Sequence, residues 1–243
     1  MAIQTINLEK KYDNKTAVNK INLSIEAGEL FALLGVNGAG KTTTIKMLSC
    51  LISPTSGDDL LLGDSIVSNP YAVKEKINVS PQETAVAPNL TVTENLKLIA
   101  EIYGDSKEAA RIKADEMIST FGLSEVARDR AKILSGGMQR RLSIAMALIS
   151  NPQILFLDEP TLGLDVLARR ELWSAIEKLK GKITIILTTH YMEEAEALSD
   201  RIGIMSKGEL KAVGTAAELI AKANAESFED AFITIASEGG MQE

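Results

Sequence analysis

The sequence predicts an α/β protein with a largely parallel β-sheet, and three observations carry this prediction. Short apolar runs that suit strands alternate along the chain with stretches that suit helices. Two of the runs, residues 30–34 and 154–157, are apolar throughout, as expected of strands buried on both faces of a parallel sheet. A glycine-rich segment, residues 35–42, joins the first of these runs to a helix-like stretch.

The individual elements follow from the hydrophobic pattern in chain order. Strands are predicted at residues 3–8, 21–25, 30–34, 77–79, 154–157, 183–187, 202–205 and 209–213. Helices are predicted at residues 42–51, 166–179, 192–198 and 216–222. Residues 84–134 differ, because amphipathic patterns such as 95–102 and 112–121 come with little strand signal, and they predict an inserted helical segment. A further amphipathic stretch, residues 227–236, precedes a polar tail that we expect to fray.

Residues 35–42 read Gly-Val-Asn-Gly-Ala-Gly-Lys-Thr and fit the phosphate-binding pattern G-x-x-x-x-G-K-[ST]. Glycine adopts at low cost the backbone angles that turn successive N–H groups onto phosphate oxygens. The positive end of the following helix points at the same anion. Lys41 would reach the terminal phosphates of a nucleotide, and the Thr42 hydroxyl would hold Mg²⁺. The alternative, an accidental glycine-rich turn, is disfavoured by the strand before the segment and the helix after it.

Two carboxylates, Asp158 and Glu159, end the apolar run 154–157. Ligands of open α/β sheets bind at the carboxyl ends of the strands, where this pair is expected to lie. Asp158 is suited to hold Mg²⁺, directly or through water, and Glu159 is suited to activate the attacking water as a general base. Alone, the pair could equally be a solvated acidic turn before Pro160, but the phosphate-binding pattern favours the site.

The segment Leu134-Ser-Gly-Gly-Met-Gln139 precedes a helix-like stretch. Ser135 is suited to cap that helix, and the two glycines expose backbone N–H groups at its start, which makes a second anion site. By itself such a turn could be only a cap. Its sequence, and its position before the strand that ends in Asp158, resemble the signature motif of ATP-binding cassette (ABC) ATPases.

The resemblance runs from Tyr12 to about Gly214. It implies an α/β fold of the P-loop NTPase (RecA-like) type, with a parallel-sheet core, an antiparallel β subdomain and an inserted α-helical subdomain. We expect a single ABC ATPase domain over residues 1–243. Within it, residues 1–83 and 135–223 would form the nucleotide-binding core, 84–134 the helical subdomain and 224–243 a C-terminal tail.

The resemblance also implies roles for single residues. Tyr12 matches the aromatic residue that stacks on adenine, although a tyrosine at a strand end is an open alternative, and Val18 is a weaker candidate for adenine contact. Gln82 matches the glutamine that touches Mg²⁺ and senses the partner domain. Asp165 matches the loop that crosses the subunit interface. His190, the only histidine of the chain, matches the switch histidine that contacts the terminal phosphate.

ATP and Mg²⁺ are therefore the expected substrate and cofactor. The implied catalytic residues are Glu159, His190 and Lys41. The implied ATP-binding residues are Tyr12, Val18, Asn37, Gly38, Ala39, Gly40, Lys41, Thr42 and Thr43. The implied Mg²⁺ ligands are Thr42, Gln82 and Asp158, and the signature residues that would act on a partner's ATP are Ser135, Gly136, Gly137 and Gln139.

Two positions depart from the family pattern. Val166 stands where many relatives have proline, and Met146 stands where many carry arginine; neither is expected to touch the chemistry. The single cysteine, Cys50, excludes an intrachain disulfide and a cysteine-rich zinc site. We expect it to be a small buried apolar residue in the helix after the glycine-rich loop.

The composition limits the classes of function. A net charge of −7 argues against general nucleic-acid binding, and aromatic residues at 4% argue against a platform for stacking single strands. We expect no secretory leader, because the first residues lack its charged and apolar regions, and no apolar run approaches the ~20 residues that span a bilayer. A transporter role would therefore need a separate transmembrane permease, with this chain peripheral on the cytoplasmic face of the membrane.

Three functions stay open at this point. The first is the ATP-hydrolysing subunit of a membrane transporter, and the second is an ABC ATPase that acts on nucleic acid or ribosomes. The third, a degenerate nucleotide-binding scaffold, is disfavoured because the motif residues are present. Residues 188–196 and 200–203 look like the branch that exports drugs, polysaccharides or lipids. The complete set of motifs favours a dimer of two identical cassettes.

Overall fold

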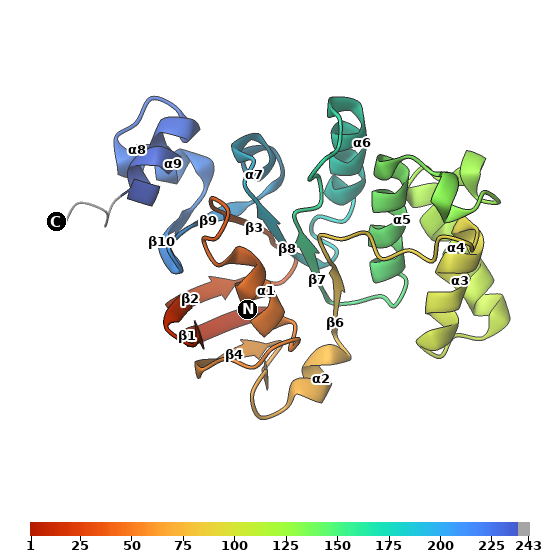
Figure 1. Cartoon of the computed structure of the whole chain (residues 1–243), viewed down its shortest axis with the longest axis horizontal. Coiled ribbons are helices and arrows are strands. Elements are labelled where there is room, and N and C mark those ends of the chain that lie inside the picture. The colour runs from red at the N-terminus through yellow and green to blue at the C-terminus, as the bar shows by residue number, and fades with distance from the viewer. Residues whose placement is uncertain (238–243) are drawn as a thin grey trace.

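A six-stranded sheet forms the centre of the computed structural model, which describes residues 1–237 (Figure 1). The strands lie in the order β10-β9-β3-β8-β7-β6. All neighbours pair in parallel except β10, which is antiparallel to β9. The bounds are β3 Leu30–Leu34, β6 Ile77–Ser80, β7 Ile154–Asp158, β8 Thr184–Thr189, β9 Arg201–Ser206 and β10 Glu209–Gly214.

Every residue of β3, β7 and β8 is buried, which explains the unbroken apolar runs at residues 30–34 and 154–157 and the largely apolar run in β8. Side chains alternate between the two faces of the sheet. Leu30, Ala32 and Leu34 of β3 pack into one hydrophobic cluster, whereas Phe31 and Leu33 pack into the other. The sheet therefore separates two cores, and its carboxyl edge is held rigid from both sides.

A second, four-stranded antiparallel sheet has the order β2-β1-β4-β5. Its strands are β1 Ile3–Tyr12, β2 Lys15–Ile25, β4 Ser56–Leu61 and β5 Asp64–Ser65, and the short helix α2 Pro70–Lys74 follows. β1 and β2 extend beyond the predicted runs, and β4, β5 and α2 were not predicted. The segment Ser56-Gly-Asp-Asp59 lacks an apolar alternation, because β4 buries Asp59 where most strands bury an apolar side chain.

The remaining helices lie against the central sheet or form a separate group beside it (Figure 1). α1 Lys41–Leu48, α5 Gly136–Leu148, α6 Val166–Glu177 and α7 Met192–Leu198 belong to the core. α3 Val92–Ile102 and α4 Lys107–Thr120 pack together and contact the core through α5. Thr91 and Glu94 form a capping box that starts α3, and Ser106 caps α4. The predicted helical insertion is thus present as helices.

Two turns of 3₁₀-helix, η1 Ser124–Val126 and η2 Ala131–Ile133, lead from α4 to α5. At the other end of the chain, α8 Ala216–Ala223 and α9 Phe228–Ser237 pack on one another beside β9 and β10. α9 confirms the amphipathic pattern at residues 227–236. The end of the polar tail, residues 238–243, lies outside the described residues, so its expected fraying stays a prediction.

The α/β fold class is confirmed, and every predicted strand overlaps an observed one. The boundaries of the subdomains stay predictions. One local expectation is wrong: α1 ends at Leu48, so Cys50 lies beyond the helix, at φ 55°, and is only partly buried. Burial nevertheless raises the pKa of the Cys50 thiol, which disfavours its reactive thiolate form.

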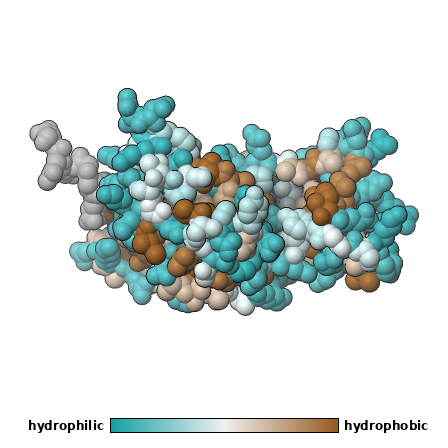
Figure 2. Space-filling model, turned by 90° about the horizontal axis from the view of Figure 1, so that it is seen from below, coloured by the Kyte–Doolittle hydropathy of each residue, from teal (hydrophilic) through white to brown (hydrophobic). Residues whose placement is uncertain are grey.

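The surface mixes polar and apolar side chains. Figure 2, which views the molecule from below, shows apolar side chains in separate patches among hydrophilic ones. Across residues 1–237, no helix combines the length and the apolar character that crossing a bilayer requires.

Candidate functional site

The glycine-rich loop lies between β3 and α1, at the carboxyl edge of the central sheet. Gly38 and Gly40 have φ of 83° and 106°, in the left-handed region that favours glycine. A Cβ atom on Gly40 would approach the Ala17 carbonyl oxygen to 2.5 Å, whereas one on Gly38 would meet no atom within 4 Å. Gly40 therefore allows close contact with the antiparallel sheet, and Gly38 leaves open space over the loop.

A backbone clamp joins this loop to the antiparallel sheet. The Gly208 N–H donates to Ala39 O over 2.9 Å, and the Asn19 N–H donates to Gly208 O over 2.8 Å. Gly208 lies in the turn between β9 and β10, and Asn19 lies in β2. These two hydrogen bonds fix the distance between the glycine-rich loop and the antiparallel sheet that contains β1 and β2.

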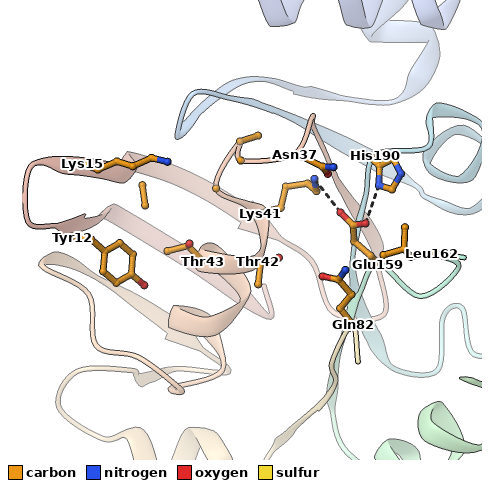
Figure 3. Close-up of a pocket in the computed structure, with 14 residues that line it drawn as sticks. Tyr12, Lys15, Asn37, Lys41, Thr42, Thr43, Gln82, Glu159, Leu162 and His190 are labelled. Carbon is orange, nitrogen blue, oxygen red and sulfur yellow. Dashed lines mark hydrogen bonds and ion pairs between the residues drawn. The ribbon is translucent and has the colours of Figure 1, made fainter. Parts of the chain in front are cut away.

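Three side chains converge beside the loop (Figure 3). Lys41 Nζ lies 3.3 Å from Glu159 Oε1, and it also donates to Gly35 O over 2.7 Å. Glu159 Oε2 lies 2.9 Å from His190 Nδ1. Lys41 and Glu159 are 4% and 9% exposed, so their charges interact in a region shielded from water. The three predicted catalytic residues therefore form one contiguous chain.

Asp158 lies at the end of β7, next to the start of α1. Its Oδ1 accepts hydrogen bonds from Thr42 Oγ1 over 3.2 Å and from Thr188 Oγ1 over 2.5 Å. Gln82 follows β6 and lies below Glu159 in Figure 3, where both residues line one cavity. Of the three predicted Mg²⁺ ligands, Thr42 and Gln82 thus line one cavity, and Asp158 lies behind Thr42, to which it is hydrogen-bonded.

Lys41, Glu159 and His190, together with Thr42 and Gln82, line a cavity of about 510 Å³, whereas Asp158 does not line it. Tyr12 and Lys15 of the antiparallel sheet lie on the other side of the cavity in Figure 3, and Ala17 of β2 also lines it. Tyr12 is 46% exposed, and Lys10 Nζ lies 5.2 Å from the centre of its ring. The remaining lining residues are Asn37, Gly38, Ala39, Gly40, Lys41, Thr42, Thr43, Gln82, Glu159, Leu162 and His190.

One predicted contact residue lies elsewhere. Val18 is fully buried in the hydrophobic cluster and does not line the cavity, whereas its neighbour Ala17 does. Side chains alternate along β2, so neighbouring residues face opposite sides of the strand. The sequence also missed Lys15, Ala17 and Leu162, because no motif residue types mark these positions.

The signature residues lie apart from the cavity. Ser135 caps α5, and its Oγ accepts a hydrogen bond from the Met138 N–H over 3.2 Å. Gly136 and Gly137 form the first residues of α5. Gln139 Nε2 donates to Ala131 O and Leu134 O, over 3.0 and 3.2 Å, and so holds the preceding turn. None of these residues lines the cavity, so the start of α5, which the sequence predicts as a second anion site, is separate from the glycine-rich loop.

Asp165 occupies a similar position at the start of α6. Its Oδ1 accepts a hydrogen bond from the Ala168 N–H over 2.9 Å, which caps the helix. Val166 and Leu167, which follow it, are 64% and 75% exposed. The loop between Glu159 and Asp165 therefore links the cavity to an exposed, partly apolar surface.

The chemistry of the donors fits ATP and Mg²⁺. Mg²⁺ prefers oxygen ligands and takes few of them from protein, with phosphate and water completing the set. The Thr42 hydroxyl and the Asp158 carboxylate are adjacent, and Gln82 offers an amide oxygen nearby. The open space over Gly38 and the buried ammonium of Lys41 suit a polyphosphate. Among residues 1–237, no three His, Cys, Asp or Glu side chains converge as ligands of a metal bound by protein alone.

Comparison with known families decides the assignment. The profile of a family described as ABC transporter matches residues 18–162. The chain belongs to the ABC transporter family. The match includes the glycine-rich loop and Glu159, which line the cavity, as well as Asp158 and Ser135.

Curated relatives of this ABC chain are ATP-binding proteins. The linearmycin resistance ATP-binding protein of Bacillus subtilis (strain 168) is 42% identical over 221 residues, which cover 90% of this chain and 71% of that protein. The daunorubicin/doxorubicin resistance ATP-binding protein of Streptomyces peucetius is 43% identical over 220 residues, 90% of this chain and 66% of that one. The Nod factor export ATP-binding protein I of Burkholderia orbicola (strain AU 1054) is 42% identical over 216 residues, which cover 88% of this chain and 71% of that protein.

Solved ABC structures share the fold. The ATP-binding subunit of an ABC transporter superposes with a TM-score of 0.85 at 27% identity, over 97% of this chain and 99% of that one. A dimeric post-hydrolysis state of an ATP-binding cassette bound to ADP and Pi superposes with a TM-score of 0.79 at 28% identity, over 88% and 98%. This ABC chain is accordingly an ATP-binding ATPase domain with the P-loop NTPase fold.

Proposed function

We propose that this chain is the ATP-hydrolysing subunit of an ABC exporter and couples ATP-driven closure of two cassettes to a separate transmembrane permease. The observation that carries the proposal is that the glycine-rich loop and the start of α5, both suited to bind phosphate, lie apart in one chain. The glycine-rich loop lines the cavity, whereas Ser135 and its glycines lie outside it. Neither surface alone encloses a nucleotide, so a second cassette supplies what the first lacks.

In the proposed dimer, two copies meet head to tail. ATP lies between the glycine-rich loop of one copy and the start of α5 of the other. The positive end of α5 and its backbone N–H groups would face the terminal phosphate. Asp165, which starts α6 on an exposed surface, would link the two sites across the interface. The dimeric cassette with ADP and Pi among the structural relatives supports this arrangement.

We assign a separate role to each group of residues in and beside the cavity. Tyr12 would stack on adenine, with Ala17 and Lys15 beside it, and the loop residues with Lys41 and Thr43 would hold the phosphates. Thr42, Asp158 and Gln82 would hold Mg²⁺, which when bound neutralises phosphate charge. Glu159 would accept the proton of the water that attacks the terminal phosphorus, and His190 would contact the departing phosphate. The products are ADP and inorganic phosphate.

The direction of transport rests on similarity. The relatives reported above are named for antibiotic resistance and for export. Residues 188–196 and 200–203 carry the pattern of that branch. These names favour a transporter over an ABC ATPase that acts on nucleic acid or ribosomes, as does the net charge of −7. The permease would place the chain at the cytoplasmic face of the membrane.

The variant Glu159→Gln tests the proposal. It should hydrolyse ATP at less than about 1% of the wild-type rate, because it removes the proton acceptor, while it still binds ATP and forms a stable dimer. Steady-state phosphate release and light scattering after size exclusion, with and without ATP, measure both effects. Glu75→Gln, an exposed change at the end of α2, is the control. Substantial turnover by Glu159→Gln would rule out the assigned base, and a monomeric mass with ATP would rule out the shared site.

A further inference from the structure

Arg140, in the second turn of α5, is a buried cation that bonds only to backbone carbonyls. It is 3% exposed. Its Nε donates to Pro160 O over 2.9 Å, its Nη2 donates to Asp158 O over 3.0 Å, and its Nη1 donates to Pro81 O. The planar guanidinium offers its donors in a fixed geometry, so the three oxygens are held at fixed relative positions.

The three carbonyls belong to the segments that carry the proposed chemistry. Pro81 immediately precedes Gln82, and Asp158 and Pro160 flank Glu159. Glu159 itself is strained, with φ 45°, and its N–H bonds to Thr188 on the opposite side of β7. Arg140 therefore holds the backbone on one side of the acidic pair while β8 holds it on the other.

The charge of Arg140 is retained despite its burial. Burial lowers the pKa of Arg140 to about 10, and the nearby carboxyl groups of Asp158 and Glu194 act in the opposite direction. Glu194 is buried as well, and burial raises its pKa. At neutral pH the guanidinium is therefore a cation, and charged donors form stronger hydrogen bonds than neutral ones.

The same helix begins with the signature residues. Ser135 lies five positions before Arg140, about 7.5 Å along the helix axis at the usual rise per residue. Ser143 of α5 also lies 3.4 Å from Ser80 of β6, between their hydroxyl oxygens. A contact that shifts the start of α5 is therefore transmitted to the ends of β6 and β7 through a rigid helix.

We propose that Arg140 is a positioning residue that aligns Gln82 and the acidic pair Asp158–Glu159 with the signature helix of the same chain. The inference rests on the proposed shared site, in which α5 of this chain contacts the partner's ATP. Arg140 then makes the geometry of one ATP site depend on the engagement of the other. It touches no reacting atom, and it acts through the backbone on both sides of Glu159.

The test compares Arg140→Lys with Arg141→Lys. A lysine keeps the charge, but its single ammonium group cannot span three carbonyls in the fixed guanidinium geometry. Arg141 is the matched control, because it anchors the same helix through Phe121 O, over 3.0 Å, and Glu171, over 3.2 Å, away from the cavity. ATP turnover, the dissociation constant for a fluorescent ATP analogue and the unfolding temperature are measured for each variant.

Arg140→Lys should lower kcat by about 10- to 100-fold, the range expected when reacting groups shift by a fraction of an ångström to an ångström. Its KM and its dissociation constant for the analogue should change less than about threefold, because the phosphate-binding loop is untouched. Arg141→Lys should stay within about twofold of wild type in all three kinetic and binding values. If Arg140 had only a structural role, Arg140→Lys would lower the unfolding temperature but would not lower kcat selectively while leaving KM unchanged.

Three results would overturn the inference while leaving the ATPase assignment intact. They are a wild-type kcat in Arg140→Lys, an equal loss in Arg141→Lys, and a parallel rise of KM and the dissociation constant. If Arg140→Lys does not fold, Arg140→Met replaces it, since an apolar side chain of similar length avoids a misplaced buried charge. Failure of both variants to fold would make Arg140 a core residue and end the proposal. A shared site that fails is recognised separately, by Glu159→Gln remaining monomeric with ATP.

Discussion

At the scale of single residues, the site depends on backbone conformations that no sequence motif predicts. Glu159 has φ 45°, a left-handed conformation that is uncommon for a residue with a side chain. Its N–H is held by the carbonyl and the hydroxyl of Thr188, over 3.1 and 3.0 Å. This conformation directs the carboxylate towards Lys41 and His190. The sequence predicted the acidic pair but not the strained backbone of Glu159. That backbone makes the two side chains point in different directions, with Asp158 towards Thr42 and Glu159 towards Lys41 and His190.

Lys41→Ala should weaken ATP binding by about 10- to 100-fold, the usual worth of a hydrogen bond to a charged group. The reason is the buried position of the ammonium beside the loop. Lys46→Ala, an exposed change in the last turn of the same helix, is the control. Titration with a fluorescent ATP analogue measures both affinities. An unchanged affinity in Lys41→Ala would remove the lysine from the phosphate site.

Asp59 predicts a dependence of stability on pH. It is fully buried, neither carboxyl oxygen has a hydrogen-bond partner, and burial, with the charge of Asp58, raises its pKa to about 8. The folded state thus binds the proton more tightly than the unfolded state, whose pKa lies near 3.8. The associated stability is complete below about pH 4 and falls by up to about 1.4 kcal/mol per pH unit as the pH rises towards 8.

Asp59→Asn should remove this slope, because the amide does not titrate. Urea denaturation at pH 5, 6.5 and 8 measures the free energy of unfolding of both proteins. The variant should gain stability relative to wild type as the pH rises. Parallel pH profiles would show that Asp59 is already ionised in the folded protein.

At the scale of elements, the prediction succeeded where one pattern determined the structure. β3, β7 and β8 are buried on both faces, so an apolar run, interrupted only by Thr184 in β8, was sufficient to identify them. β4 is short and polar, and its pairing with β1 joins residues that are 47 to 58 positions apart in the sequence. The burial of Val18 away from the cavity was not predicted for a related reason, because the face on which a strand residue lies depends on register, which tertiary pairing sets.

Ser135→Arg should prevent ATP-dependent dimerisation and leave ATP binding by the monomer intact. The added guanidinium would occupy the start of α5, where the proposed partner's ATP makes contact, and its charge is unfavourable at the positive end of a helix. Ser106→Arg removes the equivalent cap from α4 and controls for the loss of helix stability, about 1 kcal/mol. Light scattering with ATP measures the mass of each variant. A normal dimer of Ser135→Arg would contradict the shared site.

At the scale of the whole molecule, the sequence predicted the arrangement of layers and most of the cavity. The motif residues of the cavity came from segments that the parallel sheet brings to one edge. The antiparallel wall was predicted only through Tyr12. Lys15 and Ala17 reach the cavity because the second sheet packs against the loop, and no local sequence pattern records that packing.

A shared site makes activity depend on the encounter of two chains. ATP turnover per chain should therefore rise with protein concentration and then level off when dimers dominate. Phosphate release measured over a thousandfold range of chain concentration, at saturating ATP and Mg²⁺, tests this. A constant turnover per chain from a protein that is monomeric under the same conditions would show that one cassette is sufficient.

The clamp through Asn19, Gly208 and Ala39 has a consequence for which ligands the cavity accepts. It fixes the span between Tyr12 on one sheet and the Lys41–Glu159–His190 chain on the other. The cavity therefore measures length as well as charge. In the proposed binding mode, Tyr12 would stack on the base and His190 would contact the terminal phosphate of ATP. ADP lacks that phosphate, so a nucleotide bound in the same place would lose its contact with His190 after hydrolysis.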